Sequence, residues 1–326
     1  MCRRVLTRRV GKLTFAAMAG LIATSVCGTT RAAQLWYDGF TLTQDAGDYV
    51  VDSPLHGTSG GSGSFFSGNW VGNDPGDAAS LWLANSAGLS RSGLTLPTVG
   101  GAARNEVDFS CCVFGRTARL FDTPWGGFTD PDGTFYMGFL VDFGTGNATD
   151  THHRTIEMHD GGFDDGLNRN LLFGIRGFDG DTELTLAVRD SATDTFAPAA
   201  VLSENADLDD LAVQGDHYVV LKFEMSTSGN DVISAFLDPV GNVEPAPSAS
   251  VSLGQFLADR LTLAQFTFNA GDPSAAGQFD ELRVGTEFAD VGINTLEFVG
   301  VPEPATLSLF AVALVGFGLT ARRRRI

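Results

Sequence analysis

Three side chains capable of metal binding or acid–base chemistry stand at even steps on a stretch that predicts a β-strand. They are His153, Glu157 and His159, and strand alternation puts them on one face. Two imidazoles and a carboxylate are acceptable ligands for a transition metal. The pattern is also typical of a solvated sheet face, because Ile156 and Met158 occupy the opposite, apolar face. We favour the solvated face over the metal site.

Two further acids lie in Glu106-Val107-Asp108-Phe109-Ser110-Cys111, on another predicted strand. Two carboxylates about 5–5.5 Å apart act as nucleophile and acid/base in retaining glycosidases. The stretch is similar to the Glu-x-Asp-x-x-Glu signature of laminarinase-type enzymes, but Cys111 stands in place of the second glutamate. A thiol cannot take that acid/base role, so we assign no catalytic residue and expect no enzyme.

The stretch Gly57-Thr58-Ser59-Gly60-Gly61 has the Gly-x-Ser-x-Gly spacing of a nucleophile elbow. That motif requires a strand before the serine and a helix after it. A Gly/Ser-rich run follows here, which cannot sustain a helix. The sequence therefore predicts a loop at this place.

Turns rich in aspartate and two of the tryptophans are the candidate ligand-binding positions. Aspartate oxygens are hard ligands that calcium prefers, and tryptophan rings stack on sugars when they are exposed. No EF-hand spacing is present, and aspartate is also a common turn residue. Calcium is thus the one cofactor that we consider. Tryptophan in a β-sandwich is more often part of the core, and only Trp70 and Trp125, in Gly-rich surroundings, are candidates for glycan contact. The candidate calcium ligands are Asp130, Asp132, Asp160, Asp164, Asp179 and Asp181.

The elements that must position these residues are short strands separated by Gly, Asp, Asn and Pro. The run Thr134–Phe143 is nearly all apolar, which predicts a strand buried on both faces. One short helix is predicted around Leu253–Leu261. A dozen strands without alternating helices indicate a single all-β domain, an antiparallel β-sandwich, over residues 34–300. Other predicted strands are Leu35–Phe40, Ser80–Ala84, Arg104–Phe114, Arg154–His159, Leu171–Phe178, Thr182–Asp190, His217–Ser226, Val232–Leu237, Gln265–Asn269 and Gln278–Val284.

The charge of this body excludes some classes of partner. Residues 1–33 hold six of the 21 basic residues and no acid, and residues 301–326 hold four basic residues and one acid. The body therefore has 11 basic and 38 acidic residues, a formal charge of 11 − 38 = −27. Such a charge repels nucleic acids and anionic membrane surfaces. It favours cations, neutral glycans or simple solubility.

Both ends have the composition of processing segments. Residues 1–33 begin with arginines, continue with the apolar run Leu13–Val26 and finish with small residues, which predicts a signal peptide read by the export machinery. Residues 301–326 combine the triplet Pro302, Glu303 and Pro304 with an apolar run over 305–319. That run is close to the roughly 17-residue minimum of a membrane-spanning helix. The basic residues that follow stay on the cytoplasmic side; they are Arg322, Arg323, Arg324 and Arg325.

This order of triplet, apolar helix and arginines resembles the PEP-CTERM sorting signal of bacterial envelope proteins; an ordinary tail anchor is the alternative. The resemblance implies that an exosortase-type membrane protease cuts near the triplet. It also implies an inner-membrane-anchored precursor, held by the single transmembrane helix, that later reaches the cell surface or the extracellular space.

The body resembles PEP-CTERM proteins with a laminin-G or concanavalin-like domain. The stretch Gly277–Thr286 has the pattern of their closing strand, and Trp36-Tyr37-Asp38-Gly39-Phe40 that of their opening strand. The resemblance implies a jelly roll in which the first and last strands pair, so that residues 37–40 lie beside residues 279–283. It also implies contact with a glycan. We therefore expect an exported, non-catalytic surface protein that binds exopolysaccharide; the alternatives are a polysaccharide hydrolase and a purely structural matrix protein.

Overall fold

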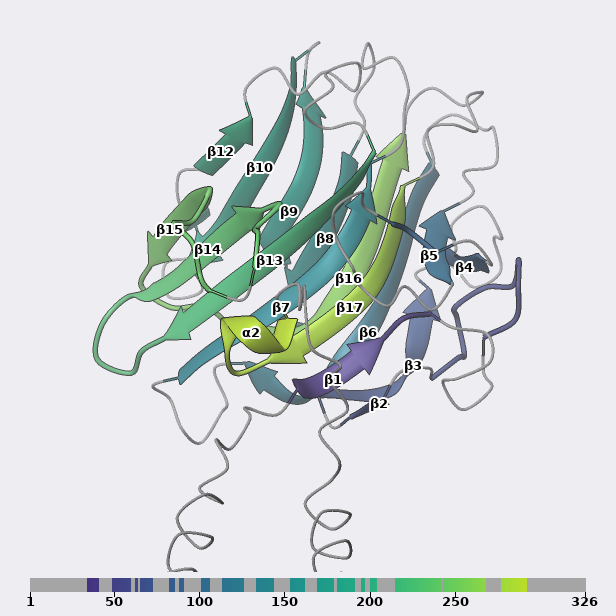
Figure 1. Ribbon diagram of the computed structural model, residues 1–326, viewed down its shortest axis with the longest axis horizontal. Coiled ribbons are helices and arrows are strands. Elements are labelled where there is room, and N and C mark those ends of the chain that lie inside the picture. The colour runs from purple at the N-terminus through teal and green to yellow at the C-terminus, as the bar shows by residue number, and fades with distance from the viewer. Residues whose placement is uncertain are drawn as a thin grey trace, which may run out of the picture. The chain divides into compact units, whose positions relative to one another are not determined.

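The fold is described from a computed structural model, and every described residue belongs to one unit that begins at Gln34. The structure describes residues 34–40, 49–59, 62–63, 65–72, 82–85, 88–90, 101–105, 113–125, 133–143, 153–161, 169–178, 181–190, 195–196, 200–203, 215–241, 243–267 and 277–291. Within these ranges the chain forms two β-sheets and one short helix (Figure 1).

The first sheet has nine strands in the described residues, in the order β15-β14-β13-β7-β17-β1-β2, with β5 on β17 and β4 on β5. Each pair with a defined register is antiparallel. The strands are β1 (Gln34–Asp38), β2 (Ser62–Gly63), β4 (Trp82–Asn85), β5 (Ala102–Asn105), β7 (Gly133–Asp142), β13 (Asp216–Met225), β14 (Asp231–Leu237), β15 (Ala249–Leu253) and β17 (Gln278–Gly285).

The second sheet has eight described strands, in the order β11-β10-β9-β8-β16-β6-β3, with β12 also on β10. These pairs are antiparallel too. The strands are β3 (Phe66–Gly72), β6 (Val113–Trp125), β8 (His153–His159), β9 (Arg169–Phe178), β10 (Asp181–Asp190), β11 (Thr195–Phe196), β12 (Ala200–Ser203) and β16 (Ala258–Thr267).

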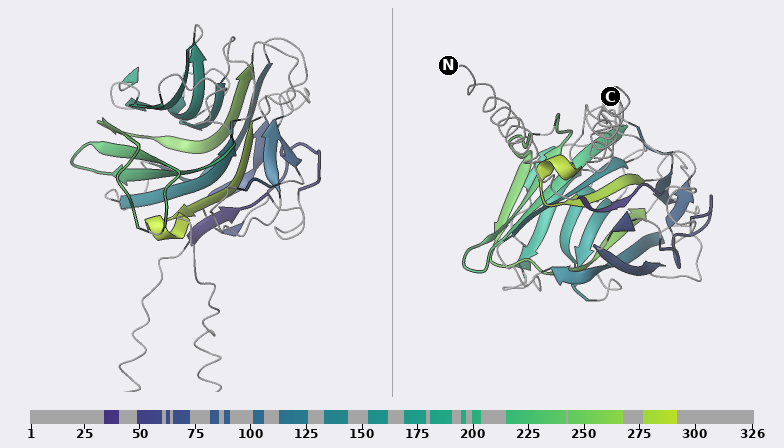
Figure 2. Two further views of the ribbon diagram at one scale, coloured as in Figure 1. Left: turned by 45° about the horizontal axis from the view of Figure 1, so that its top comes forward. Right: turned by 60° about the horizontal axis from the view of Figure 1, so that its bottom comes forward.

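The main core lies between the two sheets, which form an antiparallel β-sandwich (Figure 2). Phe139 on β7 and Phe173 on β9 meet across this space with ring centroids 6.0 Å apart. On β8, Ile156 and Met158 face the same core and are fully buried. The opposite face of the eight-stranded sheet therefore carries the residues at the alternate positions of β8.

A second, smaller core lies on the outer side of the nine-stranded sheet, under the helix α2 (Phe288–Val291) (Figure 1). The ring of Phe288 packs against Tyr136 at 5.9 Å and against Phe236 at 5.5 Å. As a result β7 is buried on both faces over most of its length. This confirms the interpretation of Thr134–Phe143 as a strand buried on both sides.

Pairing of the first and last body strands is confirmed. Tyr37 of β1 lies opposite Arg283 of β17, and Asp38 lies opposite Leu282. Strand β1 ends at Asp38 rather than at Phe40, because Phe40 has a positive φ of 48° that turns the chain.

The predicted helix at Leu253–Leu261 is wrong. Strand β15 ends at Leu253 with alternating burial, and β16 begins at Ala258. The neighbours decide this: β16 completes its backbone hydrogen bonds with both β6 and β8. Local helix propensity is too weak to compete with two such partners.

The signal peptide, the sorting triplet, the terminal arginines and the predicted transmembrane helix all lie outside the described residues. Within the described ranges, no helix is long and apolar enough to cross a membrane.

Candidate functional site

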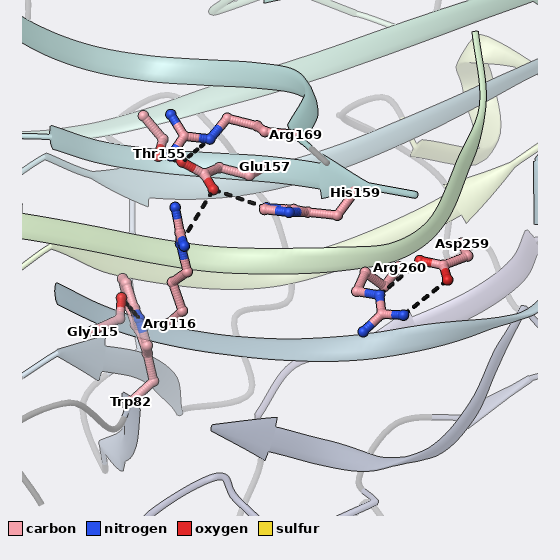
Figure 3. A network of polar contacts seen from close by, with 9 residues as sticks. All are labelled: Trp82, Gly115, Arg116, Thr155, Glu157, His159, Arg169, Asp259 and Arg260. Atoms are coloured by element: carbon pink, nitrogen blue, oxygen red, sulfur yellow. Dashed lines mark hydrogen bonds and ion pairs between the residues drawn. The ribbon is translucent and has the colours of Figure 1, made fainter. Parts of the chain in front are cut away.

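A buried carboxylate forms the centre of a polar cluster on the outer face of the eight-stranded sheet (Figure 3). Glu157 on β8 is contacted by Arg169 Nε at 3.1 Å from Oε1 and by Arg116 Nε at 3.6 Å from Oε2. His159 Nε2 lies 2.9 Å from Oε2, and the Thr155 hydroxyl donates to Oε1 at 3.1 Å. We call these five residues the Glu157 cluster.

A β-bulge directs Arg169 toward this cluster. Along β8 and β9 the register runs regularly from His153 to Met158, but His159 then pairs with Arg169 rather than with Asn170. The extra residue on β9 reverses the alternation, so that Arg169 lies on the same face as Glu157. The Asn170 amide holds the bulge by donating to the Leu257 carbonyl at 2.7 Å.

Arg116 reaches Glu157 from two strands away. Strand β16 lies between β6 and β8, and Ala264 is the residue that pairs with both Arg116 and Thr155. Because alanine ends at Cβ, the arginine side chain can extend over β16 to the carboxylate. Residue size at position 264 thus decides whether this contact can form.

The cations determine the charge state of the cluster. Burial alone would raise the pKa of Glu157, but the hydrogen bond from His159 and the charges of Arg169 and Arg116 outweigh it and lower that pKa to about 2. Burial lowers the pKa of His159, against the opposing effect of Glu157. At neutral pH the site therefore holds an ionised carboxylate beside an uncharged imidazole.

Several polar atoms on this face have no hydrogen-bond partner among the described residues. They are His159 Nδ1, Thr262 Oγ1 and Thr185 Oγ1, and all three side chains are buried. Thr262 lies opposite Glu157 on the neighbouring strand. Thr185 lies opposite Gly174, which in turn lies opposite Thr155, so the Thr185 side chain is on the same face of the sheet. A buried polar group without a partner costs about 1–3 kcal/mol. This face of the sheet therefore carries buried donor and acceptor atoms that make no hydrogen bond within the described residues.

The expectation of a solvated face at residues 153–159 is wrong, because Glu157 and His159 are buried. In the described part of the chain, no group of three His, Cys, Asp or Glu residues could hold a metal ion. The His153 side chain lies outside the described residues. Sequence reasoning found the acid and one histidine but missed both arginines, although arginine inside an apolar strand is a signal of paired burial.

Trp70 is buried in the core, so its ring offers no exposed platform on which a sugar could stack. Its indole Nε1 donates to Tyr49 Oη at 3.1 Å, and Tyr49 donates to Asp38 Oδ2 at 2.6 Å. Arg119 completes this network at 3.8 Å from Asp38 Oδ2. The side chain of Trp125 lies outside the described residues.

Of the candidate calcium ligands, only Asp160 has a described side chain, which is exposed just after β8. Asp181 is the first residue of β10, and nothing is described of its side chain. Asp130, Asp132, Asp164 and Asp179 lie outside the described residues, as do Glu106, Asp108 and Cys111.

A second polar cluster lies on the outer face of the nine-stranded sheet and was not predicted. Glu281 accepts hydrogen bonds from Arg283 at 2.7 Å and from the Tyr37 hydroxyl at 3.1 Å. A bulge between Asp280 and Arg283 and a φ of 53° at Glu281 bring these groups together. The cluster fixes β1 onto β17, and the buried Tyr218 hydroxyl beside it has no hydrogen-bond partner among the described residues.

Residues 300–325 match the PEP-CTERM protein-sorting motif. The motif implies a protein that an exosortase-type system sorts and exports through a membrane-anchored precursor. No sequence of a curated protein matches the chain significantly.

Solved structures are similar to the chain only at a distance. An endo-β-1,4-glucuronan lyase from the fungus Trichoderma reesei is 11% identical with a TM-score of 0.44, covering 81% of this chain and 100% of that one. The globular domain of T. cruzi calreticulin is 10% identical with a TM-score of 0.43, covering 86% and 100%. The CBM2 module of the evolved Dit of Lactobacillus casei BL23 phage J-1 is 10% identical with a TM-score of 0.40, covering 79% and 97%. The TM-scores of these three structures lie below 0.5, and their functions are not carried over to this chain.

Proposed function

We propose that this protein is exported, is held in the membrane as a precursor and is cut by an exosortase-type protease near Pro302-Glu303-Pro304. The match of residues 300–325 to the sorting motif supports this proposal. An apolar helix beyond the triplet would hold it at the outer boundary of the membrane, where an intramembrane enzyme can reach it. The body is then released to the cell surface or the extracellular polysaccharide.

We further propose that the body has the jelly-roll architecture of laminin-G and concanavalin-like domains and binds polysaccharide with the outer face of the eight-stranded sheet. The observation that carries this proposal is the Glu157 cluster with its unpartnered neighbours His159 Nδ1, Thr262 Oγ1 and Thr185 Oγ1. Ligand sites use a few placed polar groups to fix orientation, and they enclose most of the ligand. Since the cluster is buried, binding requires local opening of this face.

The state of Glu157 supports binding rather than hydrolysis. Glycoside hydrolysis needs one protonated and one ionised carboxyl group on either side of the bond. Glu157 has a pKa of about 2, and both of its oxygens are contacted by Arg116, Arg169, His159 or Thr155. It is therefore a poor general acid and presents no free oxygen as a nucleophile.

Sorting is tested by changing Pro302, Glu303 and Pro304 together to alanine in the full chain. We expect the wild type to lose its C-terminal segment and leave the membrane, and the variant to remain full-length in the membrane fraction. The control changes Pro245 and Pro247, two exposed prolines of the body, which should not affect sorting. Intact mass and cell fractionation measure the outcome. Equal processing of wild type and triplet variant would refute the assignment.

Binding is tested with a matched pair of arginine variants in the protein that cells release. Arg169→Met removes a cation of the Glu157 cluster, whereas Arg260→Met removes one that pairs with Asp259 on the same sheet. The two side chains are 18% and 17% exposed, so their environments are comparable. We expect Arg169→Met to lose retention on the cells' own extracellular polysaccharide and Arg260→Met to keep it. If the wild type releases reducing ends from the polysaccharide, the protein is a hydrolase. If the wild type is not retained on the polysaccharide at all, a structural matrix protein is the remaining alternative.

A further inference from the structure

The two most exposed large apolar side chains of the described residues lie in the connection between β14 and β15. Val240 is 84% exposed and Val243 is 81% exposed, whereas no other large apolar side chain that the structure describes is more than 61% exposed. We call residues 238–241 and 243–248 the valine loop. Single exposed valines are common on protein surfaces, so these two become informative only if the fold holds them in place.

The fold holds the valine loop at both ends and in its middle. At the ends, the backbone amides of Asp238 and Ser248 donate to carbonyls of β13 and β14 at 2.7 and 2.8 Å. In the middle, Glu244 accepts hydrogen bonds from the Tyr136 hydroxyl at 2.7 Å and from Lys222 Nζ at 2.9 Å. Lys222 is the only lysine of residues 34–300. The valines are thus presented by a loop that three sets of hydrogen bonds keep on the nine-stranded sheet.

The valine loop lies beside the last described element of the chain. The ring of Tyr136, whose hydroxyl holds Glu244, packs against Phe288 of α2 with the ring centroids 5.9 Å apart. Helix α2 is fixed in turn, because Asp290 Oδ2 accepts hydrogen bonds from two backbone amides that precede the helix, at 3.0 and 2.9 Å. One tyrosine therefore contacts both the valine loop and the helix after which the chain continues toward the sorting triplet.

The chain between α2 and the triplet is short. Helix α2 ends at Val291 and the triplet begins at Pro302, so residues 292–301 separate them. These ten residues span at most about 33–36 Å even when fully extended. A domain of about 260 residues is roughly 45 Å across. An enzyme that cuts near the triplet therefore works within less than one body width of α2, on the side where the valine loop lies.

Charge decides between the two partners available at that place, the protease and the lipid bilayer. Residues 238–248 contain Asp238 and Glu244 and no basic residue, and the whole body has a formal charge of −27. Anionic lipid headgroups repel such a surface. We propose that Val240 and Val243 dock onto the exosortase-type protease while the precursor is anchored, and that this contact speeds the cut. This inference rests on the sorting function proposed above.

The test changes Val240 and Val243 together to serine in the full chain and follows the loss of the C-terminal segment after pulse labelling. Because both side chains are exposed, the variant should unfold at the wild-type midpoint. Burying one valine is worth about ten-fold in affinity, so we expect the initial rate of cutting to fall by about ten-fold or more.

The matched control changes Val50 and Val51 to serine. These valines are 61% and 39% exposed in a turn that is hydrogen-bonded to β4, beyond β17 in the strand order of the same sheet. This control should be cut at the wild-type rate. The variant of Pro245 and Pro247 keeps both exposed valines and should be cut at that rate too.

A second measurement identifies what the valine loop contacts. A photo-cross-linking amino acid in place of Val243 should form an adduct with the exosortase-type protease in membranes, and one in place of Val50 should not. Adducts to lipid alone, or a serine variant of the valine loop that is cut at the wild-type rate, would overturn this inference and leave the sorting function intact. A wild-type chain that is never cut would overturn the sorting function itself.

Discussion

Replacing Glu157 by glutamine removes the one negative charge that the Glu157 cluster encloses. The lowering of the Glu157 pKa from its ordinary value of 4.5 to about 2 corresponds to about 3 kcal/mol of stability at neutral pH. Glutamine can still accept a hydrogen bond from His159, but it leaves the guanidinium groups of Arg116 and Arg169 beside a neutral amide. Breaking a buried pair from one side costs about 3–5 kcal/mol.

The sign of the pH dependence follows from the lowered pKa. Glu157 contributes its stabilisation in full above pH 4.5, and loses it as the pH falls from 4.5 toward 2 because the folded and unfolded states then both bind the proton. The difference in unfolding free energy between wild type and Glu157→Gln should therefore be about 3–5 kcal/mol at pH 7. At pH 2 most of the stabilisation by ionised Glu157, about 3 kcal/mol, should be lost, and the difference between the two proteins should shrink by that amount.

Denaturant unfolding of the purified full-length protein between pH 2 and pH 7 measures this difference. The control is Glu224→Gln, which removes a 44% exposed partner of Lys222. A surface pair contributes under about 1 kcal/mol, so this variant should follow the wild type at every pH. A Glu157→Gln difference that is equal at both ends of the pH range, or below about 1 kcal/mol at pH 7, would refute the reasoning.

Two further outcomes are expected. Ala264→Leu should block the path of the Arg116 side chain over β16 and so raise the pKa of Glu157. Overpacking by the larger side chain should also lower the unfolding free energy by about 1–3 kcal/mol. An unchanged titration of the Glu157 carboxyl group, followed by NMR, would contradict this. Burial and the charge of Glu281 raise the pKa of Asp280 to about 8 from an ordinary 3.8, so the folded state holds this proton more tightly than the unfolded chain. Stability should consequently fall as the pH rises from 4 to 8. The unfolding midpoint measured over that range should fall less for Asp280→Asn than for the wild type. An Asp280 carboxyl group that titrates near pH 4 would instead show that the hydrogen bonds from backbone amides outweigh its burial.

Much of the sandwich could be predicted because its strands carry strong local patterns. The run Thr134–Phe143 is apolar at nearly every position, short, rich in aromatic residues and preceded by a turn, which together indicate a strand buried on both faces. Strand β8 alternates apolar and polar residues, and its bounds were predicted within one residue. The helix expected at Leu253–Leu261 failed because two neighbouring strands supply the hydrogen bonds that a helix would have made internally.

Predicting the environment of a polar face was harder. Alternation placed Glu157 and His159 together, as the structure confirms, but the same pattern was taken to indicate solvent. Trp70 stands among glycines, and its sequence context left surface and core positions equally open; in the structure its indole donates to Tyr49 inside the core. In each case burial depends on what packs above the strand, which the strand's own sequence does not encode.

The sequence by itself determined the all-β class and the sorting motif over residues 300–325, because composition, period and a terminal motif are local properties. The pairing of the first and last body strands was expected only from the resemblance to jelly-roll proteins. Tertiary structure alone brought Arg116 and Arg169 to Glu157. One arginine reaches it across a small residue on an intervening strand, and the other through a bulge that reverses its face. Both contacts depend on the register between strands, and for Arg116 these strands are far apart in the chain. Register is fixed only when the sheets pack.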